Sequence, residues 1–130
     1  MTMNTTTDKI DKADVRVLVI EDEAAIAMLI EDMLLDMGFE NITIFGKLSR
    51  ALDAVKNAEF DFAVLDVNLA GEPSYPLAAV LQEKKTPFAF STGYGAVGVR
   101  EDFRNYPVLQ KPFTQKDLAD KLSKLVPQYF

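Results

Sequence analysis

The sequence predicts an α/β domain in which a five-stranded parallel sheet is doubly wound by five helices. Three observations carry this prediction. Short apolar runs rich in β-branched residues alternate with longer amphipathic stretches. The short runs are apolar at nearly every position, which is typical of strands buried on both faces. Acidic, hydroxyl and lysine side chains directly follow several of these runs. A chain of 130 residues fits one such domain.

The strands and helices are expected in strict alternation. Residues 15–20 form an apolar run, and residues 24–37 carry apolar side chains at helical spacing before Gly38, a natural helix end. The later strands are expected at 42–45, 62–67, 87–90 and 108–109, and the later helices at 48–58, 76–84, 96–103 and 114–126. Pro76 suits the first turn of the third helix, and Thr114 can cap the last helix.

Composition excludes several classes of chemistry and partner. The chain has no cysteine and no histidine, which removes disulfides, thiolate zinc sites and histidine-based mechanisms. Its net charge of −6 and scattered basic residues oppose nucleic-acid binding. No apolar run approaches the roughly 18 residues of a membrane span. Residues 1–13 are polar and lack the apolar core of a signal peptide. We therefore expect a flexible tail over 1–13, a folded domain over 14–130, and a cytoplasmic protein without nucleic-acid or membrane partners.

Polar residues follow the predicted strands at the edge where ligands bind in such folds. The residues concerned are Glu21 and Asp22 after the first strand, Asp66 at the end of the third, Thr92 after the fourth and Lys111 after the fifth. The carboxyl ends of parallel strands meet at one edge of a sheet, so these side chains are expected to converge. Three clustered carboxylates repel one another unless a cation lies among them. An all-oxygen ligand set with open positions suits Mg²⁺.

Each of these residues also has a plain structural interpretation. Asp66 could cap a loop, Lys111 could be a solvated lysine, and the acids after the first strand could simply favour a helix N-terminus. Taken together, the set suits phosphoryl transfer. A carboxylate such as that of Asp66 can attack phosphorus to give an aspartyl phosphate, while Lys111 and Mg²⁺ neutralise the phosphoryl oxygens and the Thr92 hydroxyl donates a hydrogen bond.

The ordered motifs resemble the receiver domain of two-component signalling. They are Val-Leu-Val-Ile-Glu-Asp-Glu, then Asp66, then Thr92-Gly93, then Lys111-Pro112-Phe113. The resemblance covers most of the chain between residues 15 and 126. It implies a flavodoxin-like sheet with strand order 2-1-3-4-5. It also implies phosphorylation by a histidine kinase, and a phosphotransfer or downstream effector protein as a further partner.

The resemblance assigns a role to each residue of the site. Asp66 would be the phosphoacceptor, and both Thr92 and Lys111 would contact the phosphoryl group. Asp22 and Asp66 would bind Mg²⁺ directly, Glu21 would bind it mostly through water, and the Asn68 carbonyl would complete the protein ligands. The Lys111–Pro112 peptide bond is expected to be cis.

The segment after the fourth strand indicates which kind of receiver the chain resembles. It also predicts how the protein switches. Residues 87–95 are similar to stand-alone bacterial receivers that carry a Phe-Ala-Thr-Gly stretch. Many receivers place an aromatic switch residue where this chain has Val108. The glycines after Thr92 predict that the helix over 96–103 is short or mobile and that phosphorylation orders it. The bulky ring of Tyr94 is expected to slow hydrolysis of the phosphoryl group to minutes or longer.

The sequence thus predicts a monomeric, stand-alone response regulator that signals through protein contacts or passes its phosphoryl group onward, and is not a conventional enzyme. Two alternatives stay open. A magnesium-dependent phosphohydrolase would need a second acid where Asn68 stands. A phosphorylation-independent binding module is suggested by Glu21, which replaces the aspartate commoner in the family. A flavin or nucleotide binder is disfavoured because no glycine-rich phosphate loop follows the first strand.

Overall fold

Five parallel strands form the centre of the computed structural model, which describes residues 10–130. The strands of the main sheet are β1 (Arg16–Ile20), β2 (Asn41–Phe45), β3 (Phe62–Asp66), β6 (Phe88–Thr92) and β7 (Val108–Gln110). The α-helices are α1 (Ala24–Asp36), α2 (Leu48–Asn57), α3 (Tyr75–Glu83) and α4 (Gln115–Leu125). Short 3₁₀ turns are η1 (Lys12–Asp14), η2 (Gly95–Gly98), η3 (Glu101–Phe103) and η4 (Pro127–Tyr129). Across residues 10–130, no helix combines the length and apolar character that a membrane crossing requires.

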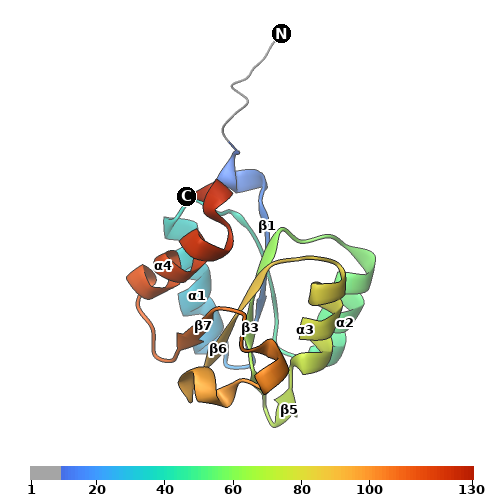
Figure 1. Cartoon of the computed structure of the whole chain (residues 1–130). Coiled ribbons are helices and arrows are strands. Elements are labelled where there is room, and N and C mark those ends of the chain that lie inside the picture. The colour runs from blue at the N-terminus through green and yellow to red at the C-terminus, as the bar shows by residue number, and fades with distance from the viewer. Residues whose placement is uncertain (1–9) are drawn as a thin grey trace.

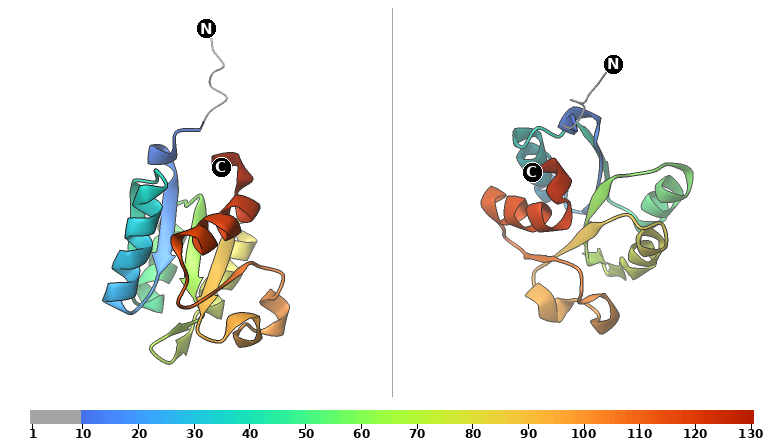
Figure 2. Two further views of the ribbon diagram at one scale, coloured as in Figure 1. Left: turned by 90° about the vertical axis from the view of Figure 1, so that its left-hand side faces the viewer. Right: turned by 45° about the horizontal axis from the view of Figure 1, so that its top comes forward.

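The sheet has the strand order β2-β1-β3-β6-β7, and every neighbouring pair is parallel. This is the predicted 2-1-3-4-5 order of a doubly wound sheet, which is confirmed. Helices α1 and α4 cover one face, while α2 and α3 cover the other (Figure 2). Each face contributes to its own buried cluster, and the central strand β3 is buried along its whole length. The strands point toward the end of the molecule that carries η2 and η3 (Figure 1).

The prediction of five helices is wrong by one, because the expected fourth helix does not form as an α-helix. In residues 10–130 the structure has four α-helices, and residues 96–103 are divided between η2 and η3. The prediction that this element is short is confirmed, while its mobility stays a prediction. Glycine is unfavourable in helices by about 1 kcal/mol relative to alanine. Gly95 also adopts a left-handed φ of +63°, which starts a turn of a different kind.

Two further details differ from the sequence patterns. Between β3 and α3, where no strand or helix was predicted, the chain forms a small antiparallel hairpin of β4 (Asn68–Leu69) and β5 (Glu72–Pro73). Lys12 falls in the stretch expected to be a tail, of which residues 1–9 lie outside the described part of the chain. Its ammonium donates to the Met37 carbonyl at 3.0 Å and lies 4.8 Å from the ring centroid of Phe130. The beginning and the end of the described chain therefore meet at the end of the sheet opposite η2 and η3 (Figure 1).

Thr114 caps the start of α4 as predicted, and together with Asp117 it forms a reciprocal capping box. The Thr114 hydroxyl accepts the Asp117 N–H at 3.1 Å, and the Asp117 carboxylate accepts the Thr114 N–H at 2.9 Å. We expect Thr114→Ala to lower the free energy of unfolding by about 1 kcal/mol, measured by urea denaturation. Thr114→Ser keeps the hydroxyl and is the control that should retain most of the stability. A Thr114→Ala protein as stable as the wild type would contradict the capping role.

Candidate functional site

Three carboxylates lie together where the central strands end. Glu21 and Asp22 follow β1, and Asp66 is the last residue of β3. Strands β1 and β3 are neighbours in register, with Ile20 opposite Leu65, so the residues that follow them lie side by side. Each of the three acids offers one carboxylate oxygen, and these oxygens lie within 4.8 Å of one another. Glu21 and Asp66 are buried, whereas Asp22 is exposed and leaves one side of the cluster open.

Lys111, which follows β7, reaches across the sheet to two of these acids. Its ammonium donates to Glu21 Oε1 at 2.7 Å and to Asp66 Oδ2 at 2.9 Å. The Glu21 side chain is 0% exposed and that of Lys111 only 17%. The second Glu21 oxygen accepts the Glu23 N–H at 3.1 Å. The Lys111–Pro112 peptide bond is cis, as predicted. The ammonium thus neutralises part of the charge of a buried acidic cluster.

The pKa values of this ion pair reflect its burial. Burial raises the pKa of the Glu21 carboxyl above its usual value, and the hydrogen bonds from Lys111 and the Glu23 N–H offset this only in part. Burial opposes the charge of Lys111, but its hydrogen bonds to Glu21 and Asp66 outweigh that effect and raise the Lys111 pKa. Lys111 therefore carries its charge throughout the physiological pH range.

Asn68 holds the loop that follows the candidate phosphoacceptor. Its backbone N–H donates to Asp66 Oδ1 at 3.2 Å, so both oxygens of the Asp66 carboxylate accept a hydrogen bond. The Asn68 side-chain oxygen accepts the Gly71 N–H at 2.6 Å and closes the turn of the β4–β5 hairpin. The side chain at this position therefore serves the turn.

Thr92 is the last residue of β6, the strand next to β3 in the sheet. Its hydroxyl takes part in the turn that follows. The hydroxyl oxygen accepts the Tyr94 N–H at 3.1 Å. Residues 94–98 then fold back over Thr92. Gly98 comes so near that a Cβ placed on it would lie only 2.8 Å from the Thr92 hydroxyl oxygen. The Tyr94 side chain is 79% exposed, and its effect on hydrolysis stays a prediction.

Gln110 is a residue near the site that the sequence patterns did not single out. Its side-chain amide donates to the Gly93 carbonyl at 3.3 Å, and its oxygen approaches Gly95 so closely that a Cβ there would lie 2.6 Å away. Gln110 thus braces the turn after Thr92 from the end of β7. In the sequence, Gln110 could have been noticed from its position directly before Lys111, at the end of a strand.

The chemistry of these donors fits a hard divalent cation. The three acids supply only oxygen ligands, two of them from buried side chains, and the exposed Asp22 leaves room for water or a phosphoryl oxygen. Lys111 holds part of the same carboxylate charge, so a cation that binds here shares Glu21 and Asp66 with the ammonium. These residues therefore fit Mg²⁺ better than softer metals, which prefer sulfur and imidazole ligands.

The raised pKa of Glu21 predicts a pH-dependent stability without divalent cations. The folded state binds the Glu21 proton more tightly than the unfolded state, so this group favours folding most at low pH. Its contribution is lost as the pH rises from the ordinary glutamate pKa through the raised value. We expect the stability of wild type relative to Glu21→Gln to fall across this window in urea denaturation. Exposed Glu23→Gln controls for the loss of one charge. A wild-type-minus-Glu21→Gln difference that is flat with pH would contradict this prediction.

The family of the chain follows from this fold and from its sequence. Residues 17–123 match the response regulator receiver domain, and the chain belongs to this family. It resembles SdrG from Sphingomonas melonis Fr1 with 39% identity and a TM-score of 0.77, over 86% of this chain and 96% of that one. It also resembles the BeF3-activated conformation of SdrG from Pseudomonas melonis Fr1, with 40% identity and a TM-score of 0.73, over 85% and 95% of the two chains.

Longer regulators share the same domain. The transcriptional regulatory protein LytR of Staphylococcus aureus strain N315 is 29% identical over 114 residues, which are 85% of this chain and 46% of LytR. The chain thus spans about half the length of the curated relatives it matches. Receiver domains are signalling domains of two-component systems that bind Mg²⁺ at an acidic pocket and interact with histidine kinases and effectors.

Proposed function

We propose that this chain is a response-regulator receiver that accepts a phosphoryl group on Asp66 from a histidine kinase in a Mg²⁺-dependent reaction. It then signals through protein contacts or passes the group onward to a phosphotransfer or effector protein. The observation that best supports this is the Lys111 ammonium, held 2.9 Å from Asp66 and 2.7 Å from Glu21 beside the carboxylate of Asp22. Since such a kinase draws on ATP, the proposed compartment is the cytoplasm.

The residues of the site divide the work of phosphoryl transfer. One Asp66 oxygen attacks phosphorus and forms an acyl phosphate, while the bond from phosphorus to the donor breaks and its electron pair leaves with the donor. Lys111 stays beside Asp66 and neutralises charge on the phosphoryl oxygens. The Thr92 hydroxyl, whose oxygen accepts the Tyr94 N–H, keeps its own O–H free to donate a hydrogen bond to a phosphoryl oxygen.

The proposed metal ligands are Asp22, Asp66, the Asn68 carbonyl, and Glu21 through water. When bound, Mg²⁺ supplies further positive charge next to the phosphoryl oxygens. Glu21 reaches Lys111 with one oxygen and the Glu23 N–H with the other, which agrees with an indirect role toward the metal. Asp22 is the exposed one of the three acids.

A groove beside the site supports docking of the kinase on α1. It lies next to Lys111 and has a volume of about 360 Å³. Its lining is mostly apolar and comes from Ile26, Leu29 and Ile30 of α1 and from Pro112 and Phe113. A partner that fills this groove would place its phosphorylated side chain at the rim of the acidic cluster.

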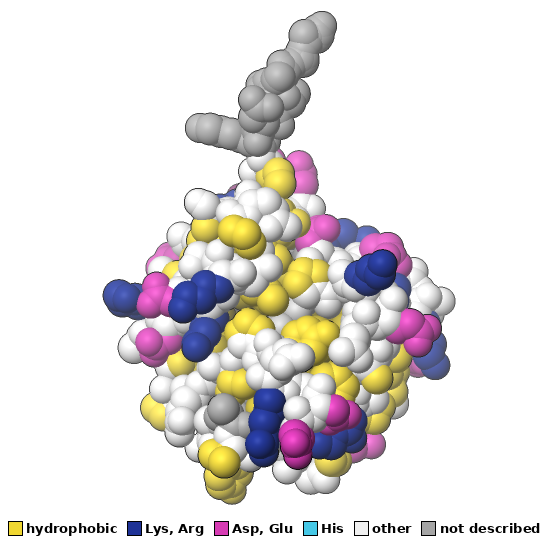
Figure 3. All heavy atoms as spheres, viewed as in Figure 1, with side chains coloured by type: hydrophobic (Ala, Val, Ile, Leu, Met, Phe, Trp, Pro, Cys, Tyr) yellow, Lys and Arg dark blue, Asp and Glu magenta, His cyan; other side chains and the backbone are white. Residues whose placement is uncertain are grey.

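On the face shown in Figure 3, basic and acidic side chains are interspersed, which does not favour a nucleic-acid partner.

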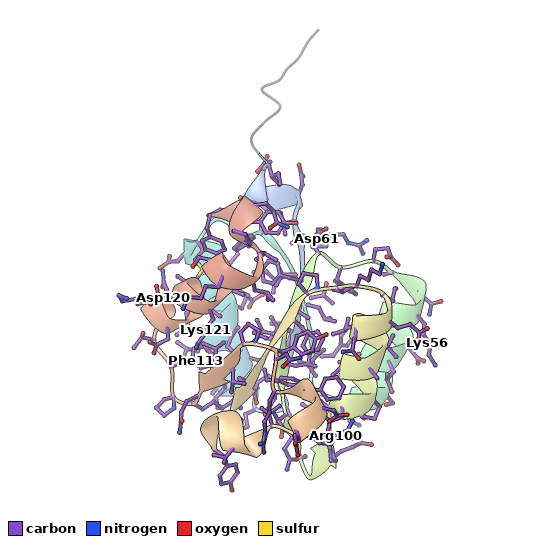
Figure 4. All side chains as sticks on the ribbon, viewed as in Figure 1. Lys56, Asp61, Arg100, Phe113, Asp120 and Lys121 are labelled. Atoms are coloured by element: carbon purple, nitrogen blue, oxygen red, sulfur yellow. The ribbon has the colours of Figure 1, made fainter. Side chains whose placement is uncertain are left out.

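The test is phosphorylation of the purified chain with acetyl phosphate, followed by intact mass. We expect the wild type to gain one phosphoryl group only when Mg²⁺ is present, and Asp66→Asn to gain none. Asp61→Asn is the matched control, because Asp61 lies just before the other end of β3 (Figure 4) and accepts the Arg16 N–H. This control should gain the same mass as the wild type. A wild type that gains no mass under any condition would leave the phosphorylation-independent binding module as the better proposal.

The phosphohydrolase alternative receives no support from the site. That mechanism needs a general acid two residues after the nucleophile, and Asn68 stands there with its side-chain oxygen accepting the Gly71 N–H. Multiple turnover of a phosphate monoester by the purified chain would revive it.

A further inference from the structure

Tyr75, the first residue of α3, joins the two loops that leave the ends of β3 and β6. Its hydroxyl donates to the Gly98 carbonyl at 3.4 Å and accepts the Arg100 N–H at 2.7 Å. These two contacts hold the backbone between η2 and η3, a stretch that forms no regular helix. The Tyr75 hydroxyl thus binds the backbone of the segment that replaces the expected fourth helix at two points.

The ring of Tyr75 is itself fixed in place. It stacks on Phe103 with a centroid distance of 5.5 Å and an interplanar angle of 11°. The Arg100 guanidinium lies 4.5 Å from the Tyr75 centroid and 5.2 Å from that of Phe103. Asp102 pairs with this guanidinium through bonds of 2.7 and 3.0 Å. Arg100 projects at the end of the molecule where the strands end (Figure 4). Removal of the hydroxyl alone would leave these stacking contacts.

Tyr75 is connected to the proposed phosphoacceptor through the backbone. Its neighbour Ser74 is fully buried, and the Ser74 N–H donates to the Val67 carbonyl at 2.9 Å. Val67 directly follows Asp66 and in turn donates its N–H to the Ser91 carbonyl at 3.0 Å. The start of α3 is therefore hydrogen-bonded to the residue that directly follows Asp66.

The other side of the contact leads to Thr92. Gly98, whose carbonyl accepts from Tyr75, lies against the Thr92 hydroxyl so closely that a Cβ would sit 2.8 Å from its oxygen. That hydroxyl accepts the Tyr94 N–H within the same turn. The turn formed by residues 94–98 therefore lies directly against the Thr92 side chain, so a movement of Thr92 is expected to disturb this turn.

We propose that Tyr75 is a positioning residue whose hydroxyl holds residues 98–100 over Thr92 in the unphosphorylated protein and releases them when Asp66 is phosphorylated. This inference rests on the proposed function. It assigns to Tyr75 the coupling that an aromatic residue at the position of Val108 provides in many receivers. The Tyr75 hydroxyl stabilises the unphosphorylated arrangement, so its removal favours the phosphorylated one.

The test compares Tyr75→Phe with wild type. The variant keeps the ring and loses only the hydroxyl. We expect about a 2- to 10-fold tighter binding of beryllofluoride with Mg²⁺, because the short bond from the Arg100 N–H and the long one to the Gly98 carbonyl together contribute about as much as one net hydrogen bond. Faster exchange of the Arg100 amide is expected in the unphosphorylated variant, because that N–H loses its acceptor. Tyr106→Phe is the matched control, since the Tyr106 ring stacks on Phe88 with ring centroids 4.0 Å apart and also packs near Phe103. It should bind like the wild type.

The outcomes separate this inference from the proposed function. A wild type that binds beryllofluoride, together with a Tyr75→Phe protein of equal or weaker affinity, would overturn the inference alone. A variant that merely lost stability would bind more weakly, so a gain in affinity specifically supports release of a contact. A wild type that neither binds beryllofluoride nor takes up a phosphoryl group would overturn the proposed function, and the coupling role with it.

Discussion

Lys111→Met is expected to lower the free energy of unfolding by about 3 kcal/mol at neutral pH without divalent cations. The substitution keeps most of the side-chain volume but leaves Glu21 and Asp66 without their shared cation. The Glu21 side chain is 0% exposed, so its charge has little access to water. Unpaired buried charges are costly, and like charges in contact repel. Denaturation in urea measures the loss.

Two further results would identify the cause of this loss. Mg²⁺ should stabilise Lys111→Met more than the wild type, because the ion replaces the missing positive charge. Phosphorylation by acetyl phosphate should slow by about 100-fold, as is typical when a group that neutralises transition-state charge is removed.

Lys116→Met is the control for Lys111→Met. Lys116 pairs with Asp120 at 2.9 Å on the exposed face of α4, where an ion pair contributes about 0.5 kcal/mol at most. A Lys111→Met protein that is as stable as Lys116→Met without Mg²⁺ would show that the acidic cluster does not depend on the ammonium.

Gly98→Ala is expected to destabilise the protein by about 2 kcal/mol, the usual effect of adding an atom where none fits. The added Cβ would lie 2.8 Å from the Thr92 hydroxyl oxygen and 2.8 Å from the Tyr94 Cβ. Either Thr92 or the turn over it must shift, so amide spectra should change around residues 92–100. Phosphorylation by acetyl phosphate is expected to change in rate as well, because Thr92 takes a new position.

Gly93→Ala is a matched control in the same turn. A Cβ on Gly93 meets no atom within 4 Å, so this substitution should alter stability by less than about 0.5 kcal/mol. Equal effects of the two substitutions would mean that the close approach of Gly98 to Thr92 does not constrain the turn.

The sequence predicted the fold and the gathering of the acidic residues because both depend on chain order. Parallel strands bring the residues that follow them to one edge, and Glu21, Asp22, Asp66 and Lys111 each follow a strand. This reasoning needs no knowledge of side-chain packing. The chemical roles of these residues stay proposals, since proximity does not show a reaction.

Features that depend on tertiary contacts could not be predicted from the sequence. Tyr75 precedes a proline at a helix start, and its contact with Gly98 joins residues 23 positions apart. The direction of the Thr92 hydroxyl is decided by a local hydrogen bond to the Tyr94 N–H. Lys12 lies in a polar stretch of the sequence, and its contacts with the Met37 carbonyl and the Phe130 ring form only in the folded chain.

The contact between Lys12 and Phe130 suggests where tags and fluorescent dyes can be attached to this protein. The turn η1, which contains Lys12, and the C-terminus lie at the end of the sheet opposite η2 and η3 (Figure 1). An immobilisation tag joined near either residue would leave the reactive rim facing the solution. Under the proposed switch, a donor–acceptor dye pair attached at these two places is expected to report loss of the native fold but not phosphorylation. A dye within residues 94–104 is expected to report phosphorylation.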